Sequence, residues 1–211
     1  MPVELVFIHG WAFDARFWDA LAPKLSQFAQ SRVDLGFFGA GTDFVPTENC
    51  VLVGHSLGFI HGVQLNAKWR SWIAINSFPR FVNSNEQPGC VTAAALRKMR
   101  MQLENDPPGA LRDFYHLIGA TSVAGTSDPA CLHDGLDQLR DCDIEDKIKA
   151  LSAPGLVLAA RNDPLVPLAI SERLGGNARL KLHDTGGHLL PQADPDWCAR
   201  EIAAFVTNGL T

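Results

Sequence analysis

The sequence contains no Cys-x-x-Cys pair, and its five cysteines are scattered and odd in number. This spacing indicates neither a disulfide framework nor a zinc site. Free thiols fit a reducing compartment, so we expect a cytoplasmic protein. The cysteines are Cys50, Cys90, Cys131, Cys142 and Cys198.

Two further absences limit the kinds of partner that we expect this protein to bind. No apolar run approaches the ~18 residues of a membrane span, and the first ten residues lack the basic start and cleavage site of a signal peptide. Basic residues number 18 against 23 acidic ones, a net charge of -5, which argues against a general nucleic-acid binder. We therefore expect a soluble protein with neither a membrane nor a nucleic acid as partner.

What is present is an ordinary globular composition over 211 residues, with 46% hydrophobic and 19% charged residues. The chain alternates short apolar runs with segments of helical spacing, and this alternation favours a doubly wound parallel α/β sheet. We expect strands in 3–10, 49–53, 72–78, 155–160 and 178–184, and a shorter strand that runs into a loop in 32–41. We expect helices in 14–28, with Asp14 as N-cap, and in 56–67, 168–175 and 194–208.

The alternation stops in the middle of the chain. Between residues 79 and 151 the sequence shows three helical candidates, 91–104, 109–119 and 129–141, and no convincing strand. We interpret residues 1–78 and 152–211 as the core and residues 79–151 as a helical cap, or lid, inserted over one edge of the sheet.

Residues 54–58 read Gly-His-Ser-Leu-Gly, between an expected strand and an expected helix. This context predicts a tight turn that holds the hydroxyl of Ser56 out at the carboxyl end of the sheet as a nucleophile. Side chains at Gly54 and Gly58 would collide with neighbouring backbone. The alternative is an ordinary glycine-flanked turn.

A serine needs a base, and in this fold class an acidic residue and a histidine follow it in that order. Asp163 and His188 each come just after an expected strand, so we predict that they complete a catalytic triad with Ser56. Asp163 has an alternative role as the N-cap of the helix that follows. His183 is the competing base, whereas His55 is expected to pack beside the turn. His61 and His116 are expected to lie on a helix surface or to line a cavity.

The charge that develops on a reacting carbonyl needs two backbone N–H donors. We predict the N–H of Leu57, directly after the serine, and that of Trp11, in the loop after the first strand. The alternative for His9-Gly10 is a turn that only ends this strand.

The stretches HGWAFDARFW, GHSLG, NDPLVP and GGH occur in this order, and together they resemble the α/β-hydrolase superfamily. The HGW opening, the short length and the helical insertion after INSFPRF are most similar to the pimeloyl-acyl-carrier-protein methyl ester esterases of biotin synthesis. The resemblance implies a trimmed α/β-hydrolase fold with no metal or organic cofactor. It also implies a serine carboxylesterase that hydrolyses the methyl ester of a pimeloyl chain borne on acyl carrier protein. One departure is that too few residues separate 41 from 51 for the helix usually found there.

The cap suggests how a substrate would bind. A basic face with Arg97, Lys98, Arg100 and Arg112 would suit an acidic carrier protein, and a merely solvated helix face is the alternative. Apolar residues of the cap are expected to line an acyl pocket or else to form plain core: Phe81, Met99, Leu103, Phe114, Leu117 and Ile118. For substrate binding we single out Phe81, Phe114, Arg97 and Arg100.

Other functions remain open on the sequence alone. A triad of this kind also suits a general small-ester carboxylesterase, a carbon–carbon bond hydrolase or a menaquinone-pathway lyase. A binding protein on a hydrolase scaffold is a further alternative, although such proteins usually lose a triad member. Dehalogenases are disfavoured because they carry an aspartate at the position of Ser56.

Overall fold

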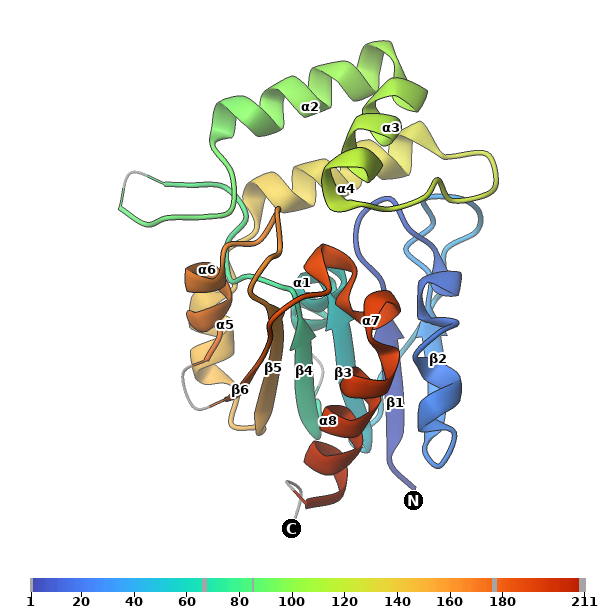
Figure 1. The fold of residues 1–211 in the computed structure, drawn as a ribbon, viewed down its shortest axis with the longest axis vertical. Coiled ribbons are helices and arrows are strands. Elements are labelled where there is room, and N and C mark those ends of the chain that lie inside the picture. Colours follow the sequence, from blue (N-terminus) through green and yellow to red (C-terminus); the bar gives the residue numbers. More distant parts are fainter. Residues whose placement is uncertain (1, 66–67, 85, 176–177, 209–211) are drawn as a thin grey trace.

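The computed structural model describes residues 2–65, 68–84, 86–175 and 178–208. Within them lies a six-stranded sheet in the order β2-β1-β3-β4-β5-β6, in which every neighbouring pair is parallel (Figure 1). The strands are β1 Glu4–Ile8, β2 Ala29–Val33, β3 Cys50–His55, β4 Ser71–Ile75, β5 Gly155–Ala160 and β6 Arg179–His183. The predicted doubly wound α/β fold is confirmed.

Burial within the sheet follows the position of each strand. The central strands β3, β4 and β5 are buried at every residue, whereas the edge strands β2 and β6 are largely half-exposed. Both faces of a parallel sheet are covered, so its central strands need apolar residues throughout. This is why the runs CVLVGH and GLVLAA contain no charged residue.

Helices cover both faces of the sheet. The helix α1 (Leu57–Gln64) lies behind the sheet in Figure 1, and α7 (Leu190–Ala193) and α8 (Pro195–Asn208) lie in front of it. The helix α6 (Leu168–Glu172) packs against β5. None of the described residues forms a helix long and apolar enough to cross a membrane.

The prediction of one helix over 14–28 is wrong. Two short 3₁₀ helices stand there instead, η1 (Ala15–Trp18) and η2 (Ala22–Leu25). Pro23 opens the second one, and in a continuous α-helix its ring would clash with the preceding turn. Asp14 caps η1 as predicted, because its side chain accepts a hydrogen bond from the N–H of Arg16 at 2.8 Å.

The segment 79–151 lies mainly over the carboxyl ends of the strands. Its helices α2 (Ala93–Asn105), α3 (Pro107–Ile118) and α4 (Pro129–Asp141) stand above the sheet, while the unexpected α5 (Glu145–Ala150) lies beside it (Figure 1). Thr92, Asp106 and Asp128 cap the first three helices through side-chain oxygens. The shorter strand expected at the start of 32–41 begins earlier, as β2, and ends at Val33, where the expected loop follows with Gly36 at a φ of 85°. The connection from there to β3, residues 34–49, contains no helix.

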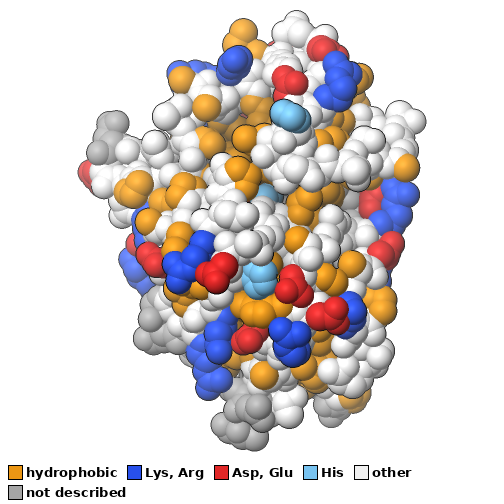
Figure 2. Space-filling view, viewed as in Figure 1, with side chains coloured by type: hydrophobic (Ala, Val, Ile, Leu, Met, Phe, Trp, Pro, Cys, Tyr) orange, Lys and Arg blue, Asp and Glu red, His pale blue; other side chains and the backbone are white. Residues whose placement is uncertain are grey.

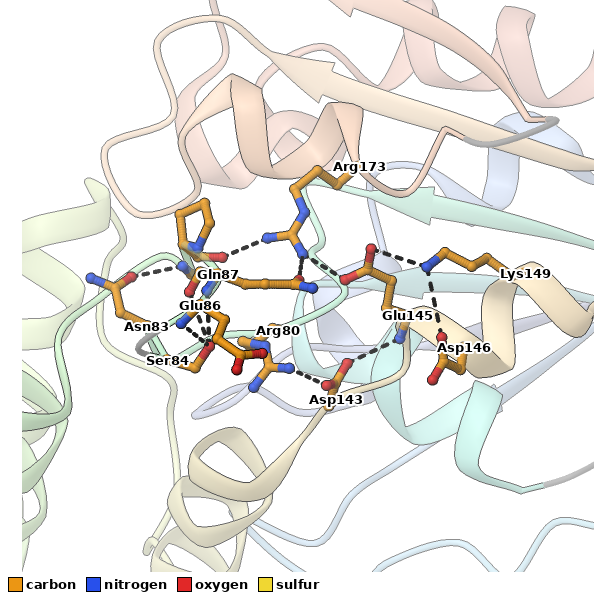
Figure 3. Close-up of polar contacts among 12 residues, drawn as sticks. Arg80, Asn83, Ser84, Glu86, Gln87, Asp143, Glu145, Asp146, Lys149 and Arg173 are labelled. Atoms are coloured by element: carbon orange, nitrogen blue, oxygen red, sulfur yellow. Dashed lines mark hydrogen bonds and ion pairs between the residues drawn. The ribbon is translucent and has the colours of Figure 1, made fainter.

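Polar contacts fasten the base of this segment (Figure 3). Arg80 pairs with Asp143, where the chain enters and leaves the segment. Arg173, which follows α6, donates to the carbonyl of Pro88 at 2.6 Å and to Glu145 at 2.5 Å, and it also bonds the side chain of Gln87. The segment is therefore anchored to the core at one corner, beside α5 and α6.

Candidate active site

Ser56 occupies the sharp turn between β3 and α1. Its φ is 51° and its ψ is -123°, a region that a residue with a side chain adopts only at a cost in free energy. Its N–H donates to the carbonyl of Ile75 at 3.1 Å, and its carbonyl accepts from the hydroxyl of Ser77 at 2.8 Å. These two bonds hold the strained turn from both sides.

The two glycines around Ser56 are required by close packing. A Cβ at Gly54 would lie 2.3 Å from the Cα of Phe59, and a Cβ at Gly58 would lie 2.1 Å from the carbonyl oxygen of Ile8. Real Cβ atoms essentially never come so close to backbone atoms. The helix α1 therefore approaches β1 and β3 closely only because these positions lack a side chain.

Asp163 and His188 form a buried pair at the same edge of the sheet. The Nδ1 of His188 lies 2.8 Å from Oδ2 of Asp163, and both side chains are only 1% exposed. The other carboxylate oxygen accepts from the N–H groups of Leu165 at 2.8 Å and Val166 at 2.9 Å. Asp163 does not cap α6, whose N-cap is Pro167.

The backbone of His188 lies directly against the serine turn. Its carbonyl accepts from Nε2 of His55 at 2.8 Å, and His55 precedes Ser56 in the chain. The ring of His55 stacks on Phe17 with centroids 4.5 Å apart. Burial lowers the pKa of His55 well below its ordinary value, and the nearby His188 lowers it further. His55 is thus a neutral packing residue that joins the serine turn to the His188 loop.

Asn76 is a member of the site that sequence reasoning missed. It follows β4 with a φ of 44°, and its side-chain amide donates to the carbonyls of Gly187 at 2.7 Å and His188 at 3.0 Å. Its side-chain oxygen accepts from the N–H of Ala160 at 2.9 Å. Asn76 therefore fixes the His188 loop relative to β4 and β5. A polar residue at the end of the buried run WIAIN was the only sequence signal.

The other histidines lie apart from this pair. The ring of His183 hydrogen-bonds the carbonyl of Thr185 at 2.7 Å and the carboxylate of Asp194 at 3.2 Å. Both of its ring nitrogens therefore have partners other than Ser56. His61 is half-buried and lines a separate cavity, and burial lowers its pKa. His116 is exposed on α3.

The loop after β1 lies against the serine turn. A Cβ at Gly10 would be 3.2 Å from the Cβ of Ser56, so the backbone of this loop approaches the serine closely. The next residue, Trp11, lines the same cavity as Ser56. Leu57 is the first residue of α1, and its N–H has no acceptor within the helix. Both predicted oxyanion donors thus belong to backbone beside Ser56.

His9 follows β1, and its ring also hydrogen-bonds the backbone of two loops. Its Nε2 accepts from the N–H of Leu35 at 3.0 Å, which leaves Nδ1 as the donor to the carbonyl of Gly10 at 2.9 Å. These bonds tie the loop after β1 to the loop after β2.

A cavity of about 270 Å³ opens at Ser56 and runs between the sheet edge and the helices α2 and α3. Its lining is mainly apolar, and the polar side chains of Lys98, Gln102 and Asp113 also border it. Of the expected apolar residues, Leu103 and Ile118 belong to the buried core instead. Those that line the cavity are Phe81, Met99, Phe114 and Leu117.

The basic residues singled out from the sequence lie outside the cavity lining. Arg97 is exposed on α2. Arg100 makes a two-pronged contact with Asp137 of α4, at 2.8 and 3.0 Å. Arg100 therefore joins α2 to α4.

A family comparison agrees with this geometry. The model of the Alpha/beta hydrolase family matches residues 5–201. The chain belongs to the Alpha/beta hydrolase family. Among solved structures, bromoperoxidase from Bacillus anthracis superposes with a TM-score of 0.85 at 17% identity, covering 99% of this chain and 93% of that one. An esterase from Exiguobacterium antarcticum gives 0.84 at 14% identity, covering 99% and 94%. At such identities these structures show the fold alone.

Relatives of this α/β hydrolase carry names from biotin synthesis. The pimeloyl-[acyl-carrier protein] methyl ester esterase of Legionella pneumophila (strain Corby) is 27% identical, covering 89% of this chain and 88% of that protein. Biotin biosynthesis bifunctional protein BioHC of Cellvibrio japonicus is 29% identical over 95% of this chain, which spans only 47% of that longer protein. These findings confirm the resemblance predicted from the motifs, and they confirm an enzyme of the hydrolase class.

Proposed function

We propose that this α/β hydrolase is a serine carboxylesterase with Ser56 as nucleophile, His188 as general base and Asp163 as the residue that orients His188. The observation that carries the proposal is the buried Asp163–His188 pair beside a strained serine that opens on an apolar cavity. A nucleophile, a base and an orienting carboxylate are the parts that acyl transfer needs.

The reaction would proceed in two steps, acylation of Ser56 and hydrolysis of the acyl-enzyme. The Ser56 oxygen attacks the ester carbonyl while Nε2 of His188 takes the hydroxyl proton, and the N–H groups of Trp11 and Leu57 stabilise the oxyanion. The carbon–oxygen bond to the alcohol then breaks, and His188 returns the proton to the departing alkoxide. Water, activated by His188, next cleaves the acyl-enzyme and releases the acid and free Ser56. Asp163 stays ionised and stabilises the imidazolium.

We further propose an acyl methyl ester as substrate, with the pimeloyl methyl ester on acyl carrier protein first among candidates. Residues 79–151 would act as the cap that encloses the acyl chain, with Phe81 and Phe114 in contact with it. The apolar lining suits a methylene chain. Two relatives carry this activity or this pathway in their names.

The carrier would dock on the basic residues of α2. Figure 2 shows basic side chains over the cap, at the top of the view, beside hydrophobic and acidic ones. Arg97 and Lys98 are exposed there, whereas Arg100 is already engaged with Asp137. A cationic surface at the cavity mouth would raise the rate of association with an acidic carrier.

Charge reversal tests the docking surface. Arg97→Glu should lower kcat/KM on the carrier-bound ester and spare a small free ester. Lys68→Glu makes the same change of charge before β4, at the opposite edge of the sheet, and should affect neither substrate. Equal loss on both substrates in Arg97→Glu would contradict carrier docking.

The proposed activity is tested by hydrolysis of pimeloyl-carrier methyl ester beside short p-nitrophenyl esters. Ser56→Ala should abolish turnover and labelling by a fluorophosphonate, and Ser26→Ala, an exposed serine, should leave both intact. Preference for the small esters would indicate a general carboxylesterase. Labelling of Ser56 without ester cleavage would indicate other chemistry on the triad. A wild-type protein that is neither labelled nor active would be a binding protein, which contradicts the proposal.

A further inference from the structure

The loop that carries Trp11 contains a second strained residue. Ala12, directly after Trp11, has a φ of 60°, which lies in the left-handed region that favours glycine. A non-glycine residue persists in this region only where its surroundings hold it. Contacts with its surroundings must therefore hold this loop in place beside Ser56.

Two helices of the segment 79–151 hold it through buried hydrogen bonds. The hydroxyl of Tyr115, on α3, donates to the carbonyl of Ala12 at 2.6 Å. The indole Nε1–H of Trp11 donates to the carbonyl of Leu132, on α4, at 2.9 Å. Both bonds span more than 100 residues of sequence, and each fixes one of two consecutive residues of the loop.

Packing reinforces these two bonds. Trp11 contacts Phe114 edge-on with centroids 4.8 Å apart, and Phe13 lies 5.9 Å from the ring of Tyr115. Tyr115 is 5% exposed and is the only tyrosine in the chain. Burial raises the pKa of Tyr115, so its hydroxyl keeps its proton and remains a donor.

We propose that the Tyr115 hydroxyl is a positioning group for the oxyanion hole: it holds the strained Ala12 carbonyl and thereby places the N–H of Trp11 beside Ser56. This inference rests on the proposed function. It gives the cap a part in the chemical step in addition to enclosing the acyl chain, because its α3 and α4 complete the support of the loop. Such a role predicts an effect on kcat even with a substrate too small to fill the cavity.

The test uses the full chain and p-nitrophenyl acetate. Tyr115→Phe keeps the ring and removes the donor, so kcat should fall about tenfold or more at unchanged KM, since misplaced oxyanion donors weaken only the transition state. Inhibition by a trifluoromethyl ketone, whose adduct carries an oxyanion, should weaken by the same factor. Adding Ala12→Gly should restore part of kcat, because glycine adopts the left-handed conformation without the strain.

Trp11→Phe supplies a second variant should Tyr115→Phe fold poorly. It removes the bond to Leu132 and is expected to lower kcat in the same way. His116→Ala is the matched control, because it changes the exposed neighbour of Tyr115 on α3, which lines neither the cavity nor the loop, and should leave hydrolysis of the acetate ester unchanged.

Three outcomes separate the two proposals. A fall in kcat at unchanged KM in Tyr115→Phe supports the positioning role, and unchanged kcat in a folded Tyr115→Phe overturns it whatever Trp11→Phe shows. Trp11→Phe decides only where Tyr115→Phe does not fold. An active wild type with unchanged kcat in the deciding variant, or with KM raised and kcat kept, overturns the positioning role and leaves the esterase intact. A wild type whose Ser56 neither reacts with a fluorophosphonate nor hydrolyses the ester overturns both.

Discussion

The Nδ1 of His188 lies 2.8 Å from Oδ2 of Asp163, in a pair from which solvent is almost completely excluded. The second oxygen of Asp163 is occupied by two backbone N–H groups of its own loop. The carboxylate is therefore held in place independently of the histidine, and it can fix the orientation and the tautomer of the ring.

Asp163→Asn should leave the fold intact and reduce kcat by about three orders of magnitude or more. The amide oxygen can still accept from Leu165 and Val166, but the amide no longer stabilises an imidazolium. The measurement is kcat on a short p-nitrophenyl ester together with a thermal unfolding curve. Asp184→Asn, at an exposed residue near His183, is the control. Activity close to wild type in Asp163→Asn would remove Asp163 from the triad.

Gly58→Ala should destabilise the protein by more than about 3 kcal/mol, because the new methyl group would overlap backbone that cannot move aside. Gly39→Ala has nothing within 4 Å of the added methyl group and should be nearly neutral. Urea unfolding of both variants measures the difference. Equal stability of the two would show that α1 can shift away from β1.

Arg173→Met should loosen the base of the cap and lower the free energy of unfolding by about 2 kcal/mol, since three acceptors lose a charged donor. Lys149→Met also removes a cation that pairs with Glu145, but the Lys149 side chain is 65% exposed. That control should change stability by less than about 0.5 kcal/mol. Similar losses in both variants would mean that only the net charge near Glu145 matters.

Asp34 makes stability depend on pH in the acid range. Burial alone would raise its pKa, but the neighbouring His9 and hydrogen bonds from the N–H groups of Gly36 and Ala15 outweigh burial and bring the pKa to about 2. A folded-state pKa below the ordinary 3.8 stabilises the protein above that value, and the contribution disappears as the pH falls through about 2.

Asp34→Asn should therefore be less stable than wild type at neutral pH, and the difference should shrink as the pH is lowered from about 4 toward 2. Denaturant unfolding at several pH values measures it. A difference that stays constant over this range would show that the charge of Asp34 does not contribute.

The buried strands and the serine turn were predictable because local sequence largely determines them. An uncharged run such as GLVLAA suits a strand covered on both faces, and its predicted bounds coincide with β5, whereas β2, at the exposed edge of the sheet, begins three residues before the expected range. The apolar spacing in 14–28 led to a wrong prediction of one continuous helix, because successive 3₁₀ turns also bury residues three or four positions apart. Phe17, Leu21 and Leu25 are buried as a helix would bury them, although no continuous helix forms.

Contacts between distant parts of the chain were beyond sequence reasoning. Asn76 and Tyr115 act through backbone carbonyls that lie about a hundred residues away, and a carbonyl leaves no signature in the sequence. Arg100 looked like a free surface cation because its partner, Asp137, lies 37 residues further on in another helix. The catalytic roles of Ser56, Asp163 and His188 stay predictions until the variants are measured.

The chain crosses from the core to the helices α2, α3 and α4 and back again at neighbouring residues, 79 and 144. The N–H of Ile144 donates to the carbonyl of Pro79 at 2.9 Å, so the two crossings are neighbours although the chain between them forms three helices. The proposed cap could therefore be exchanged as a unit: a relative's cap could be grafted between these residues without changing the path of the chain through the sheet. Such a graft would have to preserve the two hydrogen bonds to the loop after β1. A foreign cap would have to bring a donor for the carbonyl of Ala12 and an acceptor for the indole of Trp11, so the proposed oxyanion loop limits which caps evolution or a designer can attach.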